Sequence, residues 1–525
     1  MEKKRIIMQI LLYMLIPYSI VLNVFNQNFG FISITSLNVL SICLAIVGAV
    51  MGLLITFVTK KSEYSILVLL IFWLLFWTYN DIYRSTAKYG ITSKILLPVI
   101  FLILIILTIM FRKIKRNHIV SLAVPVTIII LFAINAITFI FHYAVYISND
   151  IPYHNDNQNL QVDFSLQTPN IYWIHCDGMM SFTSVSEYFG YDNSELYDYI
   201  ENEDFFINEN ASMEVGHLTM QALPALTCPN YYDTILKDYF FEKQGSFFDG
   251  STVNKIAYTT DLVNAKIDNE LVEALEAKGY ETNVIADNGG EFAFYSDNFY
   301  YTELGGVQRE HPREKSMLLY ELEVDILPLL LKETMFCPFY NILNQEDTTI
   351  MSSNEESIFF VSENEKLTIT KKAFDDVVFR NCNPQFTFVA LMTAHAPFEY
   401  DENGNIISIT NYAGDPDDYV PSWKYTGKLI TELVQEIKSN DPDAVIIIEG
   451  DHGCHFFSIE SIQEEWPNAT KQDVLNIWNS VMSAVYIPEQ YRNEDTIYLQ
   501  NPLNISRFLI NNYVGSNYEY LNIDE

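Results

Sequence analysis

The stretch Ala444-Val445-Ile446-Ile447-Ile448-Glu449-Gly450-Asp451-His452-Gly453 runs from an apolar segment straight into an aspartate and a histidine. Its unbroken run of aliphatic residues predicts a buried β-strand. Open α/β sheets place their chemistry just beyond the carboxyl ends of their strands. Asp451 and His452 are therefore candidates for half of a divalent-metal site.

A second apolar segment ends in the same way. Residues Asn170 to Cys176 read as a strand, and Asp177-Gly178 follows at once. The two strands lie more than 270 residues apart in the chain. If they are neighbours in one sheet, their ends bring Asp177, Asp451 and His452 together.

The C-terminal two thirds of the chain alternate between short apolar runs and helical patterns. This alternation predicts an α/β domain built around a central, mostly parallel sheet. The expected strands are 170–176, 281–286, 356–361, 385–391, 444–448 and 483–487. The expected helices are about 193–202, 217–227, 267–278, 316–332, 362–378, 422–438 and 503–513.

The N-terminal region has a different composition. It holds five apolar stretches, each about as long as the roughly 20 residues that cross a bilayer. A cleaved signal peptide is excluded for the first stretch, because no small-residue cleavage site follows it and four more stretches do. The sequence therefore predicts a helical transmembrane bundle of about five spans, at 6–25, 37–58, 64–80, 95–111 and 119–142.

The basic residues predict how this bundle is oriented. Lys3, Lys4 and Arg5 precede the first span, Lys60 and Lys61 separate the second from the third, and residues 112–116 separate the fourth from the fifth. These positions fall on one side of the membrane if all five stretches span, and a Lys/Arg excess marks the cytoplasmic side. An odd number of spans then places residues 146–525 outside the cytoplasm, in a multi-pass protein of the cell membrane.

Charge divides the chain at the same place. Residues 1–145 carry 12 basic and 3 acidic residues, whereas the whole chain of 525 residues has a net charge of −35. The remainder is therefore strongly acidic, which excludes nucleic acid as a partner attracted by the general field. We expect a transmembrane domain at 1–145, a polar linker at 146–166 and a catalytic domain at 167–525. Six cysteines are too few for a disulfide framework, although a bridge between Cys337 and Cys382 stays open.

Thr219 is the candidate nucleophile. It begins an expected helix in the segment Gly216-His217-Leu218-Thr219-Met220-Gln221-Ala222-Leu223-Pro224. A hydroxyl at a helix N-terminus, next to a divalent cation, can lose its proton and attack phosphorus or sulfur. The alternative is that Thr219 is simply the first residue of a helix.

His395 is the candidate for contact with the transferred group. It follows the expected strand 385–391 in the segment Leu391-Met392-Thr393-Ala394-His395-Ala396-Pro397-Phe398. A histidine beyond a strand end can donate to a substrate oxyanion. The alternative is a loop histidine that caps the turn before Pro397. His217 and His455 are weaker candidates, and Asn230 and Trp423 are possible pocket residues.

Taken together, these segments resemble the alkaline phosphatase/sulfatase superfamily, and most of all its membrane branch of lipoteichoic acid synthases, phosphoglycerol transferases and phosphoethanolamine transferases. Thr219-x-x-Ala222-Leu223-Pro224 is similar to the threonine segment of the phosphoethanolamine transferases. His395-Ala-Pro-Phe resembles the His-x-Pro-Phe/Tyr stretch of the synthases, and Gly450-Asp451-His452-Gly453 matches the shared metal motif.

The chain also departs from its relatives. True sulfatases carry Cys/Ser-x-Pro-x-Arg for conversion to formylglycine, and Cys228-Pro229-Asn230 has neither that spacing nor the arginine. Cys454 stands where many relatives have a glutamate that supports a second metal. The missing motif disfavours a strict sulfatase. The disulfide-rich pattern of the phosphoethanolamine transferases is absent as well, which favours a phosphoglycerol-type or polysaccharide-modifying relative.

The resemblance implies one divalent ion, Mn²⁺ or Zn²⁺ with Mg²⁺ also open, held by Asp177, Thr219, Asp451 and His452. Thr219 would take a phospho-head group from a membrane phospholipid and pass it to a cell-surface glycan or polymer. His395 would stabilise the transferred group or protonate the leaving group. Two alternatives stay open: a hydrolase of phosphodiesters or sulfate esters, and a catalytically dead envelope scaffold.

Overall fold

The chain forms two structural units, which are described separately. One consists of residues 1–152, 250–261 and 315–360, and the other of residues 153–249, 262–314 and 361–525. The computed structural model describes residues 2–27, 34–87, 92–115, 117–148, 160–215, 219–236, 269–286, 296–303, 306–312, 384–396, 398–407, 416–454 and 468–522, together with scattered positions between 319 and 377 and residues 463 and 466. Most of the expected linker lies outside these ranges, so its extent stays a prediction.

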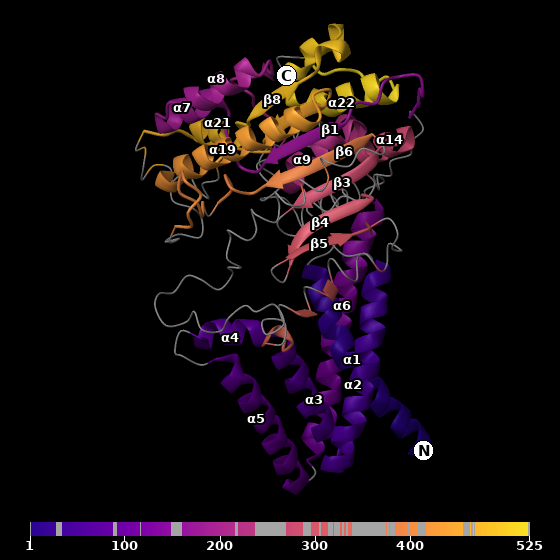
Figure 1. Cartoon of the computed structure of the whole chain (residues 1–525). Coiled ribbons are helices and arrows are strands. Elements are labelled where there is room, and N and C mark those ends of the chain that lie inside the picture. The colour runs from indigo at the N-terminus through magenta and orange to yellow at the C-terminus, as the bar shows by residue number, and fades with distance from the viewer. Residues whose placement is uncertain are drawn as a thin grey trace. The chain divides into compact units, whose positions relative to one another are not determined.

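Six helices make up the described N-terminal part of the first unit (Figure 1). They are α1 (Glu2–Gln27), α2 (Ile34–Thr59), α3 (Ser62–Trp77), α4 (Tyr79–Ala87), α5 (Ser93–Lys113) and α6 (His118–Ser148). Among the described residues, four helical stretches are long and apolar enough to cross a membrane: Ile6–Asn26, Ile34–Thr59, Ile95–Lys113 and Ile119–Ala144. A transmembrane bundle is confirmed, with about four such spans rather than five.

The third predicted span is a shorter helix than expected. The prediction of residues 64–80 was wrong at its C-terminal end, because α3 stops at Trp77 after 16 residues. The Thr78 hydroxyl donates to the carbonyl of Leu74, and the chain then turns into the more polar helix α4. A threonine that bonds back into the preceding turn competes with continuation of the helix.

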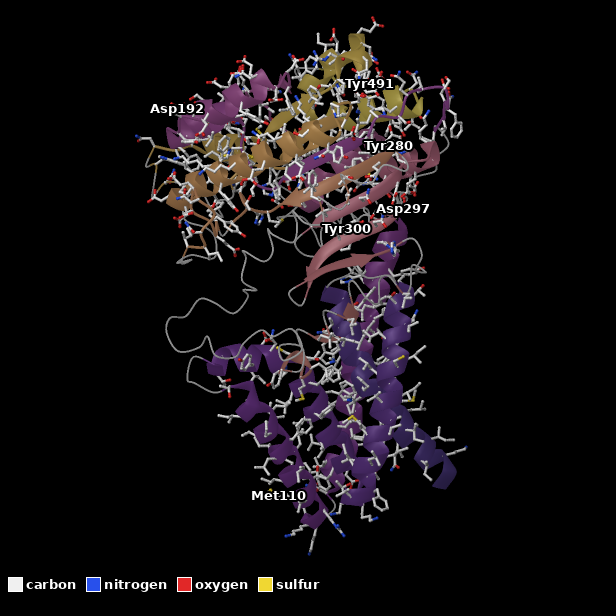
Figure 2. The ribbon with its side chains drawn as sticks, viewed as in Figure 1. Met110, Asp192, Tyr280, Asp297, Tyr300 and Tyr491 are labelled. Atoms are coloured by element: carbon white, nitrogen blue, oxygen red, sulfur yellow. The ribbon has the colours of Figure 1, made fainter. Side chains whose placement is uncertain are left out.

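The turns that carry basic residues lie side by side at one end of the bundle. The Lys61 ammonium donates to the carbonyls of Phe111 at 3.1 Å and Arg112 at 2.9 Å. The Tyr64 hydroxyl donates to the carbonyl of Lys115 at 3.0 Å. Met110, in the last turn of α5, marks this end in Figure 2. The α2–α3 and α5–α6 turns therefore face the same side.

Small residues let α1 and α2 pack closely. A Cβ added to Gly52 would lie 2.3 Å from the ring of Tyr13, and one added to Gly48 would lie 2.7 Å from Pro17. The Tyr13 hydroxyl also hydrogen-bonds the hydroxyl of Thr56 at 2.5 Å. Glycines of this kind at a helix interface are typical of membrane bundles, where backbone approach and interhelical hydrogen bonds replace the hydrophobic effect.

The second unit is built on an eight-stranded sheet in the order β2-β8-β7-β1-β6-β3-β4-β5 (Figure 1). The five central strands run parallel: β7 (Val445–Glu449), β1 (Ile171–Cys176), β6 (Gln385–Leu391), β3 (Glu281–Ala286) and β4 (Asn298–Glu303). The remaining strands pair antiparallel at the two edges: β8 (Ser483–Tyr486), β2 (Phe206–Ile207) and β5 (Gly306–Glu310). The predicted mostly parallel α/β domain is confirmed.

Five of the six predicted strands are present with ends that differ by a residue or less. The sixth, 356–361, lies outside the described residues. The sequence missed β2, β4 and β5, which stand at or next to the sheet edges and lack long apolar runs.

The described helices of this unit flank the sheet. They are α7 (Phe182–Phe189), α8 (Ser194–Asn202), α9 (Thr219–Thr227), α10 (Pro229–Tyr231), α14 (Glu270–Lys278), α19 (Pro416–Asn440), α21 (Lys471–Asn479) and α22 (Ile505–Leu509), with π-helical turns at Tyr232–Leu236 and Ile510–Val514. Alternate residues of β1, such as Tyr172 and Ile174, share a buried apolar cluster with Phe182 of α7 and Trp423 of α19. The intervening residues, including His175, face the other side of the sheet. The predicted helices 316–332 and 362–378 fall mostly outside the described residues.

Candidate active site

Three neighbouring parallel strands end at the site. Because β1 pairs with β7 on one side and β6 on the other, the residues just past their ends lie close together (Figure 1). Those residues are Asp177 after β1, His395 after β6 and Asp451 and His452 after β7. The sequence predicted that the ends of β1 and β7 converge. The end of β6, which precedes His395, joins them from the other side of β1.

Backbone contacts hold the loop after β1 in place. Gly178 has a φ of +73°, and a Cβ on it would lie 3.0 Å from the carbonyl oxygen of Ala394. A glycine therefore lets the turn after Asp177 approach the loop that carries His395. Tyr419 of α19 fixes the same turn, since its hydroxyl donates to the carbonyl of Gly178 and accepts from the amide of Met180, both at 2.9 Å.

The Asp451 carboxylate is oriented by backbone amides. Its Oδ1 accepts from the amide of Gly178 at 3.2 Å and from the amide of His452 at 3.0 Å. Its Oδ2 is left to face the site, 3.4 Å from Nε2 of His452. The backbone thus holds one oxygen of Asp451 and presents the other.

His452 presents its Nε2 in the same way. Its Nδ1 lies 2.9 Å from the carbonyl oxygen of Gly453 and is the donor of that bond, which leaves Nε2 directed at the carboxylates. Nε2 lies 3.3 Å from Oδ1 of Asp177. A Cβ on Gly453 would lie 1.8 Å from the carbonyl oxygen of Ile477, so only glycine permits this turn against α21.

Thr219 is the first residue of α9 and is buried. Its hydroxyl donates to Oδ2 of Asp177 at 3.1 Å and lies 3.5 Å from Nε2 of His452. The structure therefore brings Thr219, Asp177, Asp451 and His452 to one point, as the sequence predicted for a ligand set.

His395 stands at the mouth of this cluster. Its Nε2 lies 3.8 Å from Oδ1 of Asp177, and its side chain is 29% exposed whereas that of Asp177 is fully buried. Its Nδ1 lies 2.5 Å from the carbonyl oxygen of Ala396, which turns Nε2 inward. His395 is thus the member of the cluster that a substrate can reach from solvent.

The donor set fits a divalent cation. Oδ1 of Asp177 and Oδ2 of Asp451 are buried and accept no hydrogen bond among the described residues. Two groups of side chains present ligand atoms within 4.8 Å of one another: Asp177 with His395 and His452, and Asp177 with His175 and Asp451. Carboxylate oxygens that face imidazole nitrogens repel them unless a proton or a metal lies between. Mixed O/N sets of this kind suit Zn²⁺ or Mn²⁺.

The ionisation of these groups follows from their mutual contacts. Burial tends to raise the pKa of Asp177, but the imidazoles of His395 and His452 outweigh it and hold that pKa well below its usual range. Burial tends to lower the pKa of His452, but the carboxylates of Asp451 and Asp177 raise it to about 9. When no cation is bound, a proton on His452 therefore lies between the imidazole and the two carboxylates, where a bound cation would lie.

Two buried polar residues of the site were missed from the sequence. His175, on β1, lies 3.9 Å through Nε2 from Oδ2 of Asp451. Glu449, at the end of β7, is paired in register with His175 and accepts from the hydroxyl of Ser483 at 2.7 Å. Burial raises the pKa of Glu449 well above its usual value, which favours the neutral carboxyl. Both are polar residues inside otherwise apolar strand runs, but the sequence does not show which residues face them on the neighbouring strand.

Two of the weaker candidates, Trp423 and Asn230, do not join the cluster. Trp423 is buried in the apolar core and donates to the carbonyl of Met180 at 3.1 Å, so it does not line a pocket. The backbone amide of Asn230 is bound by Glu270 at 2.8 Å, within the turn after α9. His217 and His455 lie outside the described residues. Burial raises the pKa of the Cys454 thiol, which favours its neutral form.

A second layer of polar contacts steadies the segment after α9. The Glu270 carboxylate accepts from the amides of Asn230 and Tyr231 at 2.8 and 3.1 Å. The buried guanidinium of Arg507 donates to both carboxylate oxygens of Asp233, at 2.9 and 2.8 Å. α14 and α22 thereby hold the far end of the segment that begins with Thr219.

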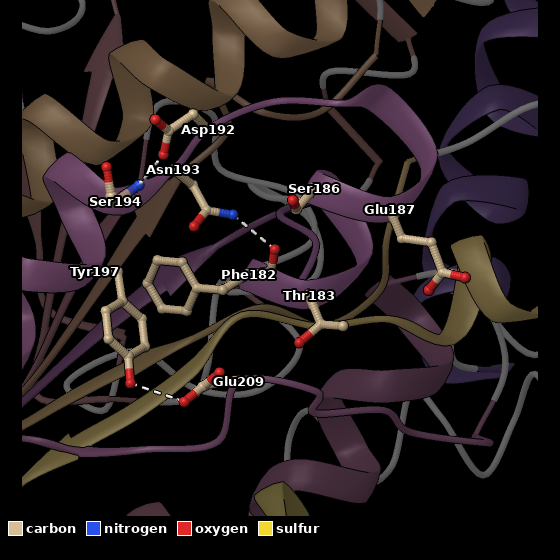
Figure 3. A pocket seen from close by; sticks show the side chains of 9 residues that line it. All are labelled: Phe182, Thr183, Ser186, Glu187, Asp192, Asn193, Ser194, Tyr197 and Glu209. Atoms are coloured by element: carbon tan, nitrogen blue, oxygen red, sulfur yellow. Dashed lines mark hydrogen bonds between the residues drawn. The ribbon is translucent and has the colours of Figure 1, made fainter.

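A cavity of about 490 Å³ lies beside α7 and α8 and shares no residue with the metal-ligand cluster (Figure 3). The Asn193 amide donates to the carbonyl of Phe182 at 2.6 Å, and the Tyr197 hydroxyl donates to Glu209 at 2.7 Å. The carboxylates of Glu187, Asp192 and Glu209 line it. Such a lining disfavours anionic ligands and offers hydrogen-bond acceptors to a hydroxyl-rich one.

Comparison with known families agrees with this fold. The sulfatase family model matches residues 185–498, more than half of the chain. The chain belongs to the sulfatase family. The matched range of this sulfatase-family protein contains Thr219, His395, Asp451 and His452 and begins eight residues after Asp177. The resemblance to the alkaline phosphatase superfamily is thereby confirmed.

Solved structures give looser likenesses. The zinc complex of the C-terminal periplasmic domain of EcEptC from Escherichia coli shares 13% identity, with 68% of this chain and 85% of that one covered and a TM-score of 0.37. The lipoteichoic acid synthase LtaP from Listeria monocytogenes shares 13% over 70% and 78%, with a TM-score of 0.36. The integral membrane phosphoethanolamine transferase EptA from Neisseria meningitidis shares 12% over 96% and 95%, with a TM-score of 0.37. Comparison with curated proteins found no match.

Proposed function

We propose that this protein is a membrane-anchored phosphotransferase that moves a phospho-head group, of phosphoglycerol type, from a membrane lipid to a cell-surface glycan or polymer. One observation carries the proposal: the hydroxyl of Thr219 lies within 3.5 Å of both a carboxylate and an imidazole of a buried metal-ligand set. A hydroxyl in that setting is an activated nucleophile. The apolar helices supply a reason for a lipid donor, because confinement to one membrane raises its local concentration.

In the first step, Oγ1 of Thr219 attacks the phosphorus of the lipid phosphodiester. The Thr219–phosphorus bond forms as the bond to the diglyceride oxygen breaks, and the Thr219 proton passes to Asp177, which accepts its hydrogen bond. A bound divalent cation, held by Asp177, Asp451, His452 and Thr219, would lower the pKa of the threonine and offset the charge on the phosphoryl oxygens.

His395 is placed to manage the proton of the leaving group. In its protonated form Nε2 gives a proton to the departing diglyceride oxygen, while Nδ1 stays bound to the carbonyl of Ala396. In the second step, the neutral Nε2 accepts the proton of an acceptor hydroxyl as that hydroxyl attacks phosphorus. The bond from phosphorus to Thr219 breaks, and Oγ1 of Thr219 takes back the proton from Asp177. Its partial exposure suits contact with both substrates.

The acceptor is proposed to be a hydroxyl-rich glycan or polymer. The cavity beside α7 supports this choice, because the aromatic ring of Tyr197 and the acidic side chains suit sugar hydroxyls and repel free polyanions. α7 begins five residues after Asp177, on the segment that leaves the site.

We propose that the catalytic unit is extracytoplasmic. The Lys61 contacts put the α2–α3 and α5–α6 turns at one basic end, so the chain leaves that end at Ser62 and returns to it at Lys113. This supports an odd number of crossings even though α3 itself is short. A reporter fused after residue 160 should be active only where exported proteins are active, and cytoplasmic activity would overturn the orientation.

The function is tested by following both halves of the donor. Full-length protein in vesicles of phosphatidylglycerol labelled in the head group and in the diglyceride should release diglyceride in step with head-group transfer to an added glycan. Head group released only as a free phosphate ester would favour the hydrolase alternative. Bound metal with no turnover of any membrane lipid would favour the scaffold alternative.

A further inference from the structure

A segment of the later chain packs on the membrane helices. Residues 315–360 belong to the same structural unit as α1 to α6, although they lie between β5 and β6 in the sequence. Among the described residues of this stretch, Met335 and Cys337 are buried in the apolar cluster that also holds Trp73, Phe76 and Tyr79. The contact is therefore with the end of α3 and the start of α4.

The contact completes the end of α3. A helix leaves its last carbonyls without intrahelical partners. The amide of Met335 donates to the carbonyl of Phe76 at 3.1 Å, and the ring of Phe336 meets the ring of Phe76 edge-on with centroids 5.4 Å apart. Within a bilayer no water can satisfy such a carbonyl, so a donor from elsewhere in the chain is needed.

The depth of the contact follows from helix geometry. Phe76 comes 14 residues after Ser62, at the basic end of the bundle. At a rise of 1.5 Å per residue it lies about 21 Å from that end, whereas the hydrocarbon layer is about 30 Å thick. The contact with Met335 thus falls inside the thickness of the apolar layer.

The outer surface of the segment suits lipid. The run Ile326-Leu327-Pro328-Leu329-Leu330-Leu331 has no charged residue. Leu327 and Phe336 are each 47% exposed, while Ile326 and Met335 are buried. Trp73, Trp77, Tyr79 and Tyr83 surround the docking point, and aromatic residues of this kind gather at membrane interfaces.

We propose that the described residues 326, 327 and 334–338 make a membrane-dipping contact, which docks on α3 and α4 and exposes Leu327 and Phe336 to the acyl chains of the leaflet opposite the basic turns. The part of the chain that follows α6 thereby contacts the bilayer again, at a second place. The partner is the lipid surface. The proposal does not depend on the reaction that the site performs.

Depth is measured with a fluorophore and lipid-borne quenchers. Leu327→Cys and Phe336→Cys, in full-length protein with Cys43 and Cys382 replaced by Ser, are labelled with a nitrobenzoxadiazole dye in vesicles that carry nitroxide acyl chains. Matched controls are Ile130→Cys on the exposed side of α6 and Ser194→Cys on α8. We expect quenching at 327 and 336 at least half as strong as at 130, with little quenching by aqueous iodide. Behaviour like that of Ser194→Cys would overturn the proposal.

Docking is measured by a disulfide. Sγ of Cys337 lies 3.8 Å from Oδ1 of Asn80, so Asn80→Cys brings two thiols together. Mild oxidation in membranes should link positions 80 and 337 in most chains, and the double variant Asn80→Cys/Cys337→Ser should give no link. Failure to link in correctly inserted protein would overturn the docking. Neither readout uses turnover, so its failure leaves the catalytic proposal untouched.

Discussion

The hydroxyl of Thr219 lies 3.1 Å from Oδ2 of Asp177, so the start of α9 and the end of β1 meet at one buried point. The two residues are 42 positions apart in the chain, and His452, which lies 3.5 Å from the same hydroxyl, comes from a third segment. The proposed nucleophile and the proposed metal ligands thus come from separate elements that only the fold brings together.

Loss of the Asp451 carboxylate should empty the metal site. Asp451→Ala removes Oδ2, which faces His452, and Oδ1, which backbone amides hold, so we expect bound metal to fall to background and turnover to be lost. Chelation of the native protein should lower its thermal stability, since a ligand at 100 times its Kd adds about 2.7 kcal/mol. Metal analysis and thermal unfolding check both.

Asp443→Ala is the matched control, because Asp443 is exposed, lies just before the start of β7 and accepts a hydrogen bond from the side-chain amide of Gln490. It should keep metal and activity. Unchanged metal content in Asp451→Ala would remove Asp451 from the site.

Metal affinity should fall as pH falls below about 9, because a proton on His452 competes with the cation. The metal-free protein should show the opposite trend. The folded-state pKa of His452 is raised above its unfolded value of 6.5, so its contribution to stability is complete below pH 6.5 and is lost as pH rises to about 9. Metal titrations and apo-protein melts between pH 6 and 9.5 measure both trends. A flat metal affinity over this range would contradict the assignment of His452.

Much of the fold could be predicted because strong local patterns produce it. The apolar runs of β1, β3, β6, β7 and β8 end in or near turn residues, and their alternation with helices leaves few other topologies. The edge strand β5 could not be predicted, because residues such as Arg309 and Glu310 give it no apolar period. The end of α3 was missed because Tyr79 continues the apolar pattern past Thr78, while the side chain of Thr78 and the amide of Met335 end the helix.

Residues of the candidate site could be predicted only where they belong to short motifs of metal-ligating side chains. Asp177, Asp451 and His452 follow strands directly, so their place was readable once the strands were assigned. His175 and Glu449 were not singled out, because a polar residue within a strand acquires its meaning from a partner on the next strand. That register is a tertiary property, and one sequence does not contain it.

His395→Gln should lower the transfer rate by about 10² to 10³ and leave metal content near normal. The reason is that His395 stands at the exposed mouth, while the other ligands remain buried. Steady-state transfer assays with metal analysis check this. His311→Gln, beyond the edge strand β5, is the control and should change neither quantity. A loss of metal with His395→Gln would make His395 a ligand and not a proton donor.

The most direct test of the account is the mass of the peptide that contains Thr219 after the native protein has met labelled phosphatidylglycerol without an acceptor. We predict a phospho-head-group adduct on Thr219, its removal when the glycan acceptor is added, and none in Thr219→Ala, whose turnover should fall by at least about 10³. Thr219→Ser should keep part of both signals, because it keeps the hydroxyl. An unmodified Thr219 together with near-normal transfer by Thr219→Ala would contradict the covalent mechanism and leave direct attack by water or the acceptor hydroxyl.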